Sequence, residues 1–321
     1  MKVLITRKIP EAAGEIFQKA GYKVSVYQKD SPIPKEELIK RGNDADAVIS
    51  LLTDKIDAEV IDQLDRCRII ANYAVGFNNI DVEYAQKKNI IVTNTPDILT
   101  DATADIAMAL ILACARNIVE GDKFIREGKF EGWKPRLMLG KELRGKTIGI
   151  AGAGRIGTET AKRAKAFGMK INYFNRSKKE VFEKETGAKK VTLNSLMKRS
   201  DVISLHLPLT KSTINLLDGN QLNLMKPDAI LVNTSRGEIV DEKALINILK
   251  QKKIFAAGFD VYENEPKINK EFFKLKNAVL LPHLGSATFE ARNKMAELAA
   301  KNVVNVLSGR KAISPVGSNY K

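Results

Sequence analysis

Only two histidines occur among the 321 residues, His206 and His283, so few side chains can exchange a proton near neutral pH. His283 lies between an apolar run typical of a strand and a stretch typical of a helix. Glu265 follows another such strand, and a carboxylate close to His283 would keep the imidazole protonated and oriented. The planar fork of Arg236 can bind two oxygens of a carboxylate. These residue types suit the protonation of a carbonyl oxygen in a small substrate whose carboxylate is held by a cation.

The order of strands explains why these residues should meet. Ligands of doubly wound sheets bind outside the carboxyl ends of the strands. The polar residues that follow predicted strands in the second half of the chain are Asn175, His206, Arg236, Asp260 and His283. We therefore expect the reacting groups at that edge.

A glycine-rich loop follows the predicted strand Thr147–Ala151 and precedes helical Thr158–Phe167. In such a loop the first glycine permits a tight turn, the second lets the backbone approach a pyrophosphate, and the third lets the helix pack on the strand. The helix N-terminus offers free N–H groups to phosphates. The loop predicts dinucleotide binding and consists of Gly152, Ala153, Gly154, Arg155, Ile156 and Gly157.

The next strand ends at Asn175, where NAD enzymes usually carry an acid that binds the ribose 2′-hydroxyl. Here Asn175 is followed by Arg176, Ser177, Lys178 and Lys179. A guanidinium, a hydroxyl and two ammonium groups suit a 2′-phosphate, so the sequence favours NADP over NAD. The alternative is a solvated turn that tolerates NAD.

Strand-like and helix-like stretches alternate along the chain, which predicts an α/β fold with two doubly wound parallel sheets. Apolar stretches at 101–119 and 287–308 predict long helices that join the two domains. Residues 130–143 contain Gly132, Pro135 and Gly140 and predict an irregular excursion, and residues 314–321 predict a tail. We expect one domain of residues 1–100 with 287–321 and a dinucleotide-binding domain of residues 101–286. The expected strands are 2–6, 23–27, 47–51, 69–72 and 90–93, then 147–151, 170–174, 202–205, 229–233, 255–259 and 279–281.

The composition excludes several classes of protein. The net charge is +15, but Lys is spread over the predicted helices and forms no nucleic-acid-binding stripe. No apolar run approaches the roughly 20 residues of a membrane span. Two distant cysteines, Cys67 and Cys114, argue against a disulfide framework and for a cytoplasmic protein. No metal-ligand cluster is apparent in the sequence.

Five motifs together resemble the D-isomer-specific 2-hydroxyacid dehydrogenase family, and within it the glyoxylate and hydroxypyruvate reductases. The resemblance covers nearly the whole chain. It implies a flavodoxin-like substrate domain, a Rossmann domain, a small 2-oxo or 2-hydroxy acid as substrate, and a homodimer. The motifs are residues 72–81, 152–157, 233–237, 259–266 and 282–288.

The resemblance also implies roles for individual residues. His283 is the general acid/base, Glu265 its partner and Arg236 the carboxylate clamp. On the cofactor side it implies Thr103 near the phosphates, Asp260 on the nicotinamide amide, His206 near the adenosine, and further contacts from Thr234, Ser235 and Gly285. On the substrate side it implies Leu51 with Leu52, and the backbone N–H groups of Val75 and Gly76. Trp133 belongs to the excursion that helps form the dimer in similar reductases; ordinary packing is its alternative role.

Two other functions remain open at this stage. Another 2-hydroxy acid, such as 3-phosphoglycerate or D-lactate, could be the substrate. Members of the family also serve as dinucleotide-gated transcriptional corepressors, although the chain lacks long disordered extensions, which favours an enzyme.

Overall fold

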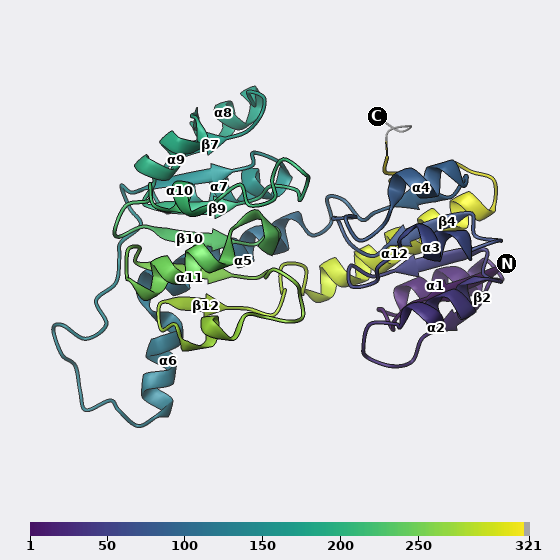
Figure 1. Ribbon diagram of the computed structural model, residues 1–321, viewed down its shortest axis with the longest axis horizontal. Coiled ribbons are helices and arrows are strands. Elements are labelled where there is room, and N and C mark those ends of the chain that lie inside the picture. Colours follow the sequence, from purple (N-terminus) through teal and green to yellow (C-terminus); the bar gives the residue numbers. More distant parts are fainter. Residues whose placement is uncertain (318–321) are drawn as a thin grey trace. The chain divides into compact units, whose positions relative to one another are not determined.

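The computed structural model describes residues 1–317 and divides into two compact units (Figure 1). One unit contains Met1–Leu99 and the chain from Ala287 onward, and the other contains Thr100–Ser286. Each unit is built on its own parallel sheet, as the alternating pattern predicted. The boundaries lie one residue or less from those drawn on the sequence.

The first unit has a five-stranded sheet in the order β2-β1-β3-β4-β5, and every pairing is parallel. All residues of β3 and β4 are buried, as expected for strands covered on both faces. Its elements are β1 (Lys2–Ile5), α1 (Ala12–Lys19), β2 (Lys23–Val26), α2 (Lys35–Gly42), β3 (Ala47–Ser50), α3 (Ala58–Asp62), β4 (Ile69–Asn72), α4 (Val82–Lys87), β5 (Ile91–Thr93) and α12 (Phe289–Leu307).

The second unit has a seven-stranded parallel sheet in the order β12-β11-β10-β9-β6-β7-β8. Apolar side chains of α9, α10 and α11 form one core layer, and those of α5, α7 and α8 form another. Its elements are α5 (Thr100–Arg116), α6 (Ile118–Arg126), β6 (Thr147–Ala151), α7 (Arg155–Ala166), β7 (Lys170–Phe174), α8 (Glu180–Thr186), β8 (Lys189–Lys190), α9 (Leu193–Arg199), β9 (Val202–Leu205), α10 (Gly219–Leu222), β10 (Ile230–Asn233), the 3-10 turn η1 (Gly237–Ile239), α11 (Glu242–Lys250), β11 (Ala256–Phe259), η2 (Lys270–Lys274) and β12 (Ala278–Leu280).

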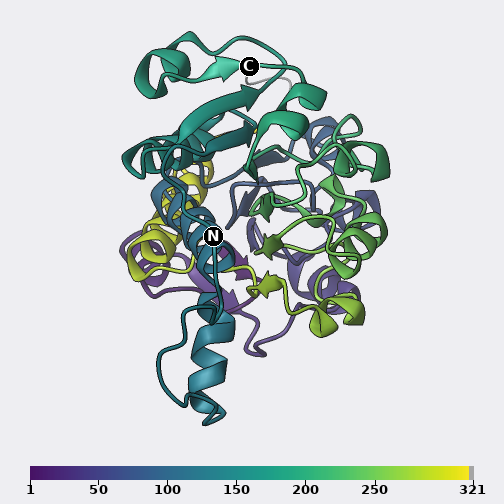
Figure 2. The ribbon, with the colours of Figure 1, turned by 90° about the vertical axis from the view of Figure 1, so that its left-hand side faces the viewer.

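The expected single helix over 101–119 is wrong, because the chain breaks at Asn117. Asn117 adopts a left-handed conformation, which Asn tolerates better than most residues. Its side-chain amide donates to the carbonyls of Met138 (3.1 Å) and Leu139 (3.4 Å). Helix α6 therefore starts in a new direction and projects from its sheet in both views (Figures 1 and 2).

Two other expectations need correction. The two-residue strand β8 was not predicted, because a strand this short leaves no periodic pattern. The segment from Ser314 is also not a free tail. Ser314 donates its hydroxyl to the Asn94 carbonyl (2.6 Å), and the Val316 amide donates to the Val92 carbonyl (2.9 Å). Residues 318–321 of the expected tail lie outside the described residues.

No single helix in residues 1–317 is long and apolar enough to cross a bilayer. Helices α5 and α6 reach the required length and composition only as a pair bent by 64°, and α5 is largely buried within its own unit.

Candidate active site

The glycine loop has the geometry of a phosphate cradle. Gly152 has a positive φ of 101° and packs against the His206 carbonyl, and a side chain at Gly157 would collide with the Gly152 carbonyl. At Gly154, by contrast, no atom lies within 4 Å of where a Cβ would stand. Helix α7 begins at Arg155, three residues earlier than predicted, so its first-turn N–H groups lie inside the loop. Space at Gly154 beside these amides fits a dinucleotide pyrophosphate.

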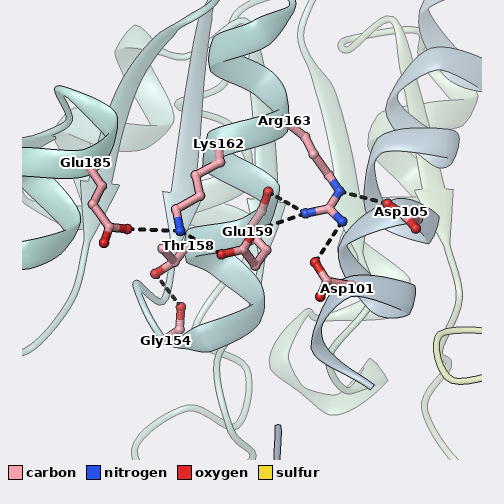
Figure 3. Close-up of polar contacts among 8 residues, drawn as sticks. All are labelled: Asp101, Asp105, Gly154, Thr158, Glu159, Lys162, Arg163 and Glu185. Atoms are coloured by element: carbon pink, nitrogen blue, oxygen red, sulfur yellow. Dashed lines mark hydrogen bonds and ion pairs between the residues drawn. The ribbon is translucent and has the colours of Figure 1, made fainter. Parts of the chain in front are cut away.

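Helix α7 is tied to its neighbours by a charged network (Figure 3). Arg163 of α7 contacts Asp101 (2.9 Å) and Asp105 (2.7 Å) of α5 and Glu159 (3.3 Å) of its own helix. Lys162 bridges Glu159 (2.8 Å) to Glu185 of α8 (3.1 Å). The Arg163 side chain is 26% exposed and that of Glu159 27%, so water screens this pair less than most surface pairs, whereas Asp101 and Asp105 are exposed. The network holds in place the helix whose N-terminus forms the cradle.

The turn after β7 presents the residues expected at a 2′-phosphate. Asn175 donates its side-chain amide to the Ser177 carbonyl (3.1 Å), and Arg176 and Ser177 are exposed. Lys178 lies 3.5 Å from Glu183, whereas Arg176 makes no ion pair within the described chain. The Arg176 guanidinium is therefore available to an anionic ligand.

His283 and Glu265 meet as the sequence interpretation required. His283 Nδ1 lies 2.9 Å from Glu265 Oε2, and the Tyr262 amide donates to Glu265 Oε1 (2.9 Å). Burial would raise the pKa of Glu265, but the hydrogen bond and charge of His283 outweigh it and hold that pKa below its usual value. An ionised carboxylate accepts from Nδ1–H, so Nε2 of His283 is the nitrogen available for proton exchange.

Arg236 follows β10 in a loop held by Asn233. The Asn233 side chain donates to the Arg236 carbonyl (2.8 Å) and accepts from the Ser235 amide (3.0 Å). Gly237 packs directly on the peptide between Tyr262 and Glu263, where a Cβ would collide. This approach brings the Arg236 loop against the Glu265 loop. The pKa of Arg236 lies below its usual value, because burial lowers it by more than the nearby charges of Glu265 and Glu238 raise it.

Asp260 anchors the loop that carries His283. Its two carboxylate oxygens accept from the amides of Leu284 (2.6 Å) and Gly285 (2.7 Å), and burial raises its pKa. The Thr103 hydroxyl donates to the Gly285 carbonyl (2.9 Å). His283 itself has a φ of +55°, a conformation that is unfavourable outside glycine and must be held by its surroundings. Asp260 and Thr103 are thus structural anchors here, whatever contacts they make with a cofactor.

His206 is suited to a neutral role. Its Nε2 lies 2.9 Å from the Ser204 hydroxyl, and burial lowers its pKa to about 3. Its carbonyl packs against Gly152, which places it beside the cradle. Thr234, also assigned to the cofactor side, is nearly buried, and its hydroxyl has no partner within the described residues.

Leu51, Val75 and Gly76 lie in the first unit, at the carboxyl end of its sheet. Leu51 directly follows β3, and the turn with Val75 and Gly76 follows β4. Leu51 and Gly76 are partly exposed.

The sequence interpretation missed Tyr262, although it lies inside a quoted motif. Its hydroxyl donates to the Leu281 carbonyl (2.9 Å), two residues before His283, and its amide binds Glu265. The signal available in the sequence was a tyrosine three residues before the predicted acid Glu265 and directly after apolar Val261. No set of three or more His, Cys, Asp or Glu side chains in residues 1–317 is arranged to hold a metal.

Comparisons with known proteins show what this chain is similar to. Residues 108–285 match the family model of the D-isomer specific 2-hydroxyacid dehydrogenase, NAD binding domain. The chain is 52% identical to a glyoxylate reductase of Thermococcus litoralis, over 96% of this chain and 94% of the relative. A solved structure from Thermus thermophilus has a TM-score of 0.94 at 43% identity, covering 99% of this chain and 100% of that one. An NADPH-dependent glyoxylate/hydroxypyruvate reductase from Sinorhizobium meliloti, solved with NADP and malonate, has a TM-score of 0.88 at 31% identity, covering 98% and 96%.

Proposed function

The chain belongs to the D-isomer-specific 2-hydroxyacid dehydrogenase family and reduces a small 2-oxo acid with a nicotinamide dinucleotide, and from this premise we propose that glyoxylate is its main substrate and hydroxypyruvate a second. The identity of about half to a glyoxylate reductase over nearly the full length supports this choice. The observation that carries the proposal is the His283–Glu265 pair, whose side chains lie 2.9 Å apart, with the Glu265 loop packed against the loop of Arg236.

We assign the proton to His283 and the carboxylate to Arg236. The bound dinucleotide supplies the hydride. Protonated His283 gives its Nε2 proton to the carbonyl oxygen, and Glu265 stabilises the imidazolium until then. Arg236 holds the substrate carboxylate by its two-pronged guanidinium. In the first unit, the family resemblance assigns the backbone amides of Val75 and Gly76 to a substrate carboxylate, and we keep that assignment as part of the proposal.

Initial rates test this assignment. Glyoxylate, hydroxypyruvate and pyruvate are each supplied with NADH and NADPH, and the highest kcat/KM is expected with glyoxylate. His283→Ala should lower kcat by a factor of about 100 or more while leaving the dinucleotide dissociation constant unchanged. Turnover that survives in this variant would refute the role of His283, and a clear preference for pyruvate would refute the substrate.

We also propose that NADP is preferred over NAD. Three observations support this preference. Position 175 carries Asn and not an acid, and the Arg176 guanidinium makes no ion pair within the described chain. A similar reductase was also solved with NADP. Arg176→Ala should raise KM for NADPH about tenfold, because it removes a charge-assisted hydrogen bond, and leave KM for NADH nearly unchanged. Lys184→Ala is the matched control, since Lys184 is an exposed lysine on α8 outside this turn. Equal effects on both cofactors would contradict the preference.

A homodimer formed through the projecting arm, residues 118–143, completes the proposal. Helix α6 has no buried residue, and apolar side chains along the arm are exposed: Ile118, Val119, Ile125, Phe130, Leu139 and, at 84%, Trp133. Such exposure is costly in a monomer and typical of an interface. Trp133→Glu should convert the dimer to a monomer in light scattering, whereas Phe273→Glu, at an exposed site outside the arm, should not. A monomeric wild type would overturn this.

A further inference from the structure

The turn after β4 in the first unit has an unusual arrangement of its carbonyls. Three successive backbone carbonyls each accept a hydrogen bond from a residue at the carboxyl end of the sheet. The Ala74 carbonyl accepts from the Thr95 amide (2.9 Å), the Val75 carbonyl from the Asn94 side chain (2.8 Å), and the Gly76 carbonyl from the Asn72 side chain (2.8 Å). Asn72 ends β4, and Asn94 and Thr95 follow β5. All three carbonyls therefore point toward the end of the sheet.

A trans peptide is planar, so its N–H points opposite to its C=O. The amides of Val75, Gly76 and Phe77 are thus directed away from the sheet. Within residues 1–317, the Gly76 and Phe77 amides donate to no acceptor. Gly76 is partly exposed and Phe77 is exposed, so these donors can be reached from solvent. Successive N–H groups with one direction form a concavity that binds anions.

We propose that Asn72 and Asn94 are positioning residues, whose side-chain amides hold this turn so that its N–H groups bind the substrate carboxylate. The inference rests on the proposed function, which gives that carboxylate to Val75 and Gly76. The inference adds that the affinity of the enzyme for its substrate depends on two side chains that do not touch the substrate.

The surroundings of Asn72 support this role. Asn72 is completely buried, and its Oδ1 accepts from the Ser50 hydroxyl (3.1 Å), which fixes the amide with its nitrogen toward Gly76. Asn79 Oδ1 also accepts from Asn72 (3.2 Å), and Asn79 Nδ2 donates to the Leu51 carbonyl (3.1 Å). One network of side-chain amides thus links the turn to Leu51, the other residue assigned to the substrate in this unit.

An Asn→Asp change keeps the shape of the side chain but turns the donor into an acceptor. An ionised Asp at position 94 would repel the Val75 carbonyl and let the peptide rotate. A protonated Asp can still donate to that carbonyl. The affinity for a carboxylate should then depend on pH in the variant, with binding restored on the acidic side, where the carboxyl is neutral.

The experiment compares glyoxylate with glyoxylamide, its uncharged amide, in the full-length enzyme with saturating NADPH. In Asn94→Asp at pH 8 we expect KM for glyoxylate to rise about tenfold, the equivalent of one hydrogen bond, with a smaller change for glyoxylamide. Asn94 is buried, so burial should raise the pKa of an Asp at this position, and the rise in KM should shrink as the pH is lowered toward that pKa. Asn72→Asp should act in the same direction. Ser50→Ala removes only the hydrogen bond that orients Asn72, so it should raise KM for glyoxylate by less. This variant replaces Asn72→Asp in the experiment if Asn72→Asp does not fold.

Asn43→Asp is the matched control, since Asn43 also donates to a carbonyl in this unit, that of Gln63, but away from the turn. Its KM values should match the wild type. If the wild-type enzyme does not distinguish glyoxylate from glyoxylamide, the carboxylate assignment of the proposed function is wrong. If the wild type distinguishes them and Asn94→Asp and Ser50→Ala keep its KM values, or raise both equally, the positioning inference is wrong.

Discussion

Nδ1 of His283 lies 2.9 Å from Oε2 of Glu265, and the other oxygen of that carboxylate is held by the Tyr262 amide at the same distance. Both side chains are 28% exposed. The carboxylate is therefore fixed in direction while the imidazole keeps one nitrogen open. This relationship leads to the first of five predictions.

Glu265→Gln removes the charge and leaves one acceptor oxygen, so His283 and the Tyr262 amide can no longer each bond to an oxygen of their own. We expect kcat to fall by a factor on the order of 100, because a neutral amide stabilises the imidazolium less than a carboxylate does. For the same reason the alkaline limb of the kcat/KM profile should move to lower pH. Glu263→Gln, in the same exposed loop, is the control and should leave the profile unchanged. An unshifted profile in Glu265→Gln would show that the charge of Glu265 is not needed.

Gly154→Ala and Gly157→Ala should separate binding from folding. A methyl at Gly154 meets no protein atom, so the protein should fold normally but lose dinucleotide affinity by about tenfold, because the methyl fills the cradle. A methyl at Gly157 collides with the Gly152 carbonyl and should destabilise the fold by about 1–3 kcal/mol. Thermal unfolding and NADPH titration measure the two effects. Full affinity in Gly154→Ala would place the pyrophosphate elsewhere.

Tyr262→Phe should loosen the His283 loop. The variant leaves the Leu281 carbonyl without its hydroxyl donor, at a cost of about 1–2 kcal/mol in the free energy of unfolding. We expect kcat to fall and the dinucleotide dissociation constant to stay constant. Tyr84→Phe, whose hydroxyl bonds at the surface to Asp62, is the matched control and should be silent in both measurements. An unchanged kcat in Tyr262→Phe would limit this residue to a stabilising role.

Arg163→Met should destabilise the second unit by about 1–2 kcal/mol, because Asp101, Asp105 and Glu159 lose their shared cation. Added salt should reduce the difference from the wild type by screening the carboxylates that remain. Lys301→Met removes a single exposed pair with Glu297, outside the proposed dimer arm, and is expected to have no measurable effect. Chemical denaturation at low and high salt measures both variants, and an equal stability of Arg163→Met and wild type would contradict the prediction.

Asp54→Asn should stabilise the protein at neutral pH. Burial raises the pKa of Asp54, although the Leu51 amide and the Thr6 hydroxyl both donate to it. A raised pKa means that the folded state favours the protonated form, so the wild type loses stability as pH rises from the unfolded value through the folded value. The neutral amide avoids this loss.

The melting temperature of Asp54→Asn should therefore equal or exceed that of the wild type at neutral pH, and the advantage should shrink in acid as the wild-type carboxyl becomes protonated. Asp44→Asn, at a site 54% exposed, controls for the change in net charge. A variant less stable than the wild type at neutral pH would show that the ionised carboxylate is required.

Much of this protein could be predicted from local patterns in the sequence. Apolar runs of four or five residues that alternate with amphipathic helices report which segments are buried, and they predicted both parallel sheets. The spacing of Gly152, Gly154 and Gly157 indicates a loop in which the backbone must turn tightly or approach other groups closely, which a side chain would prevent. The residues after the strands, among them Arg236, Glu265 and His283, follow from the rule that parallel strands bring their carboxyl ends to one edge.

Only the tertiary structure decided how polar atoms from distant segments pair. Several hydrogen bonds join residues that have no periodic relation in the sequence. They are the bonds of Asp260 to the loop that carries His283, of Tyr262 to Leu281, and of Asn72 and Asn94 to one turn. The break at Asn117 and the docking of Ser314 depend likewise on carbonyls far along the chain. Burial leaves a repeating trace in a sequence because it depends on the face of an element. A hydrogen bond between two loops leaves none, since it depends on where the whole fold brings them.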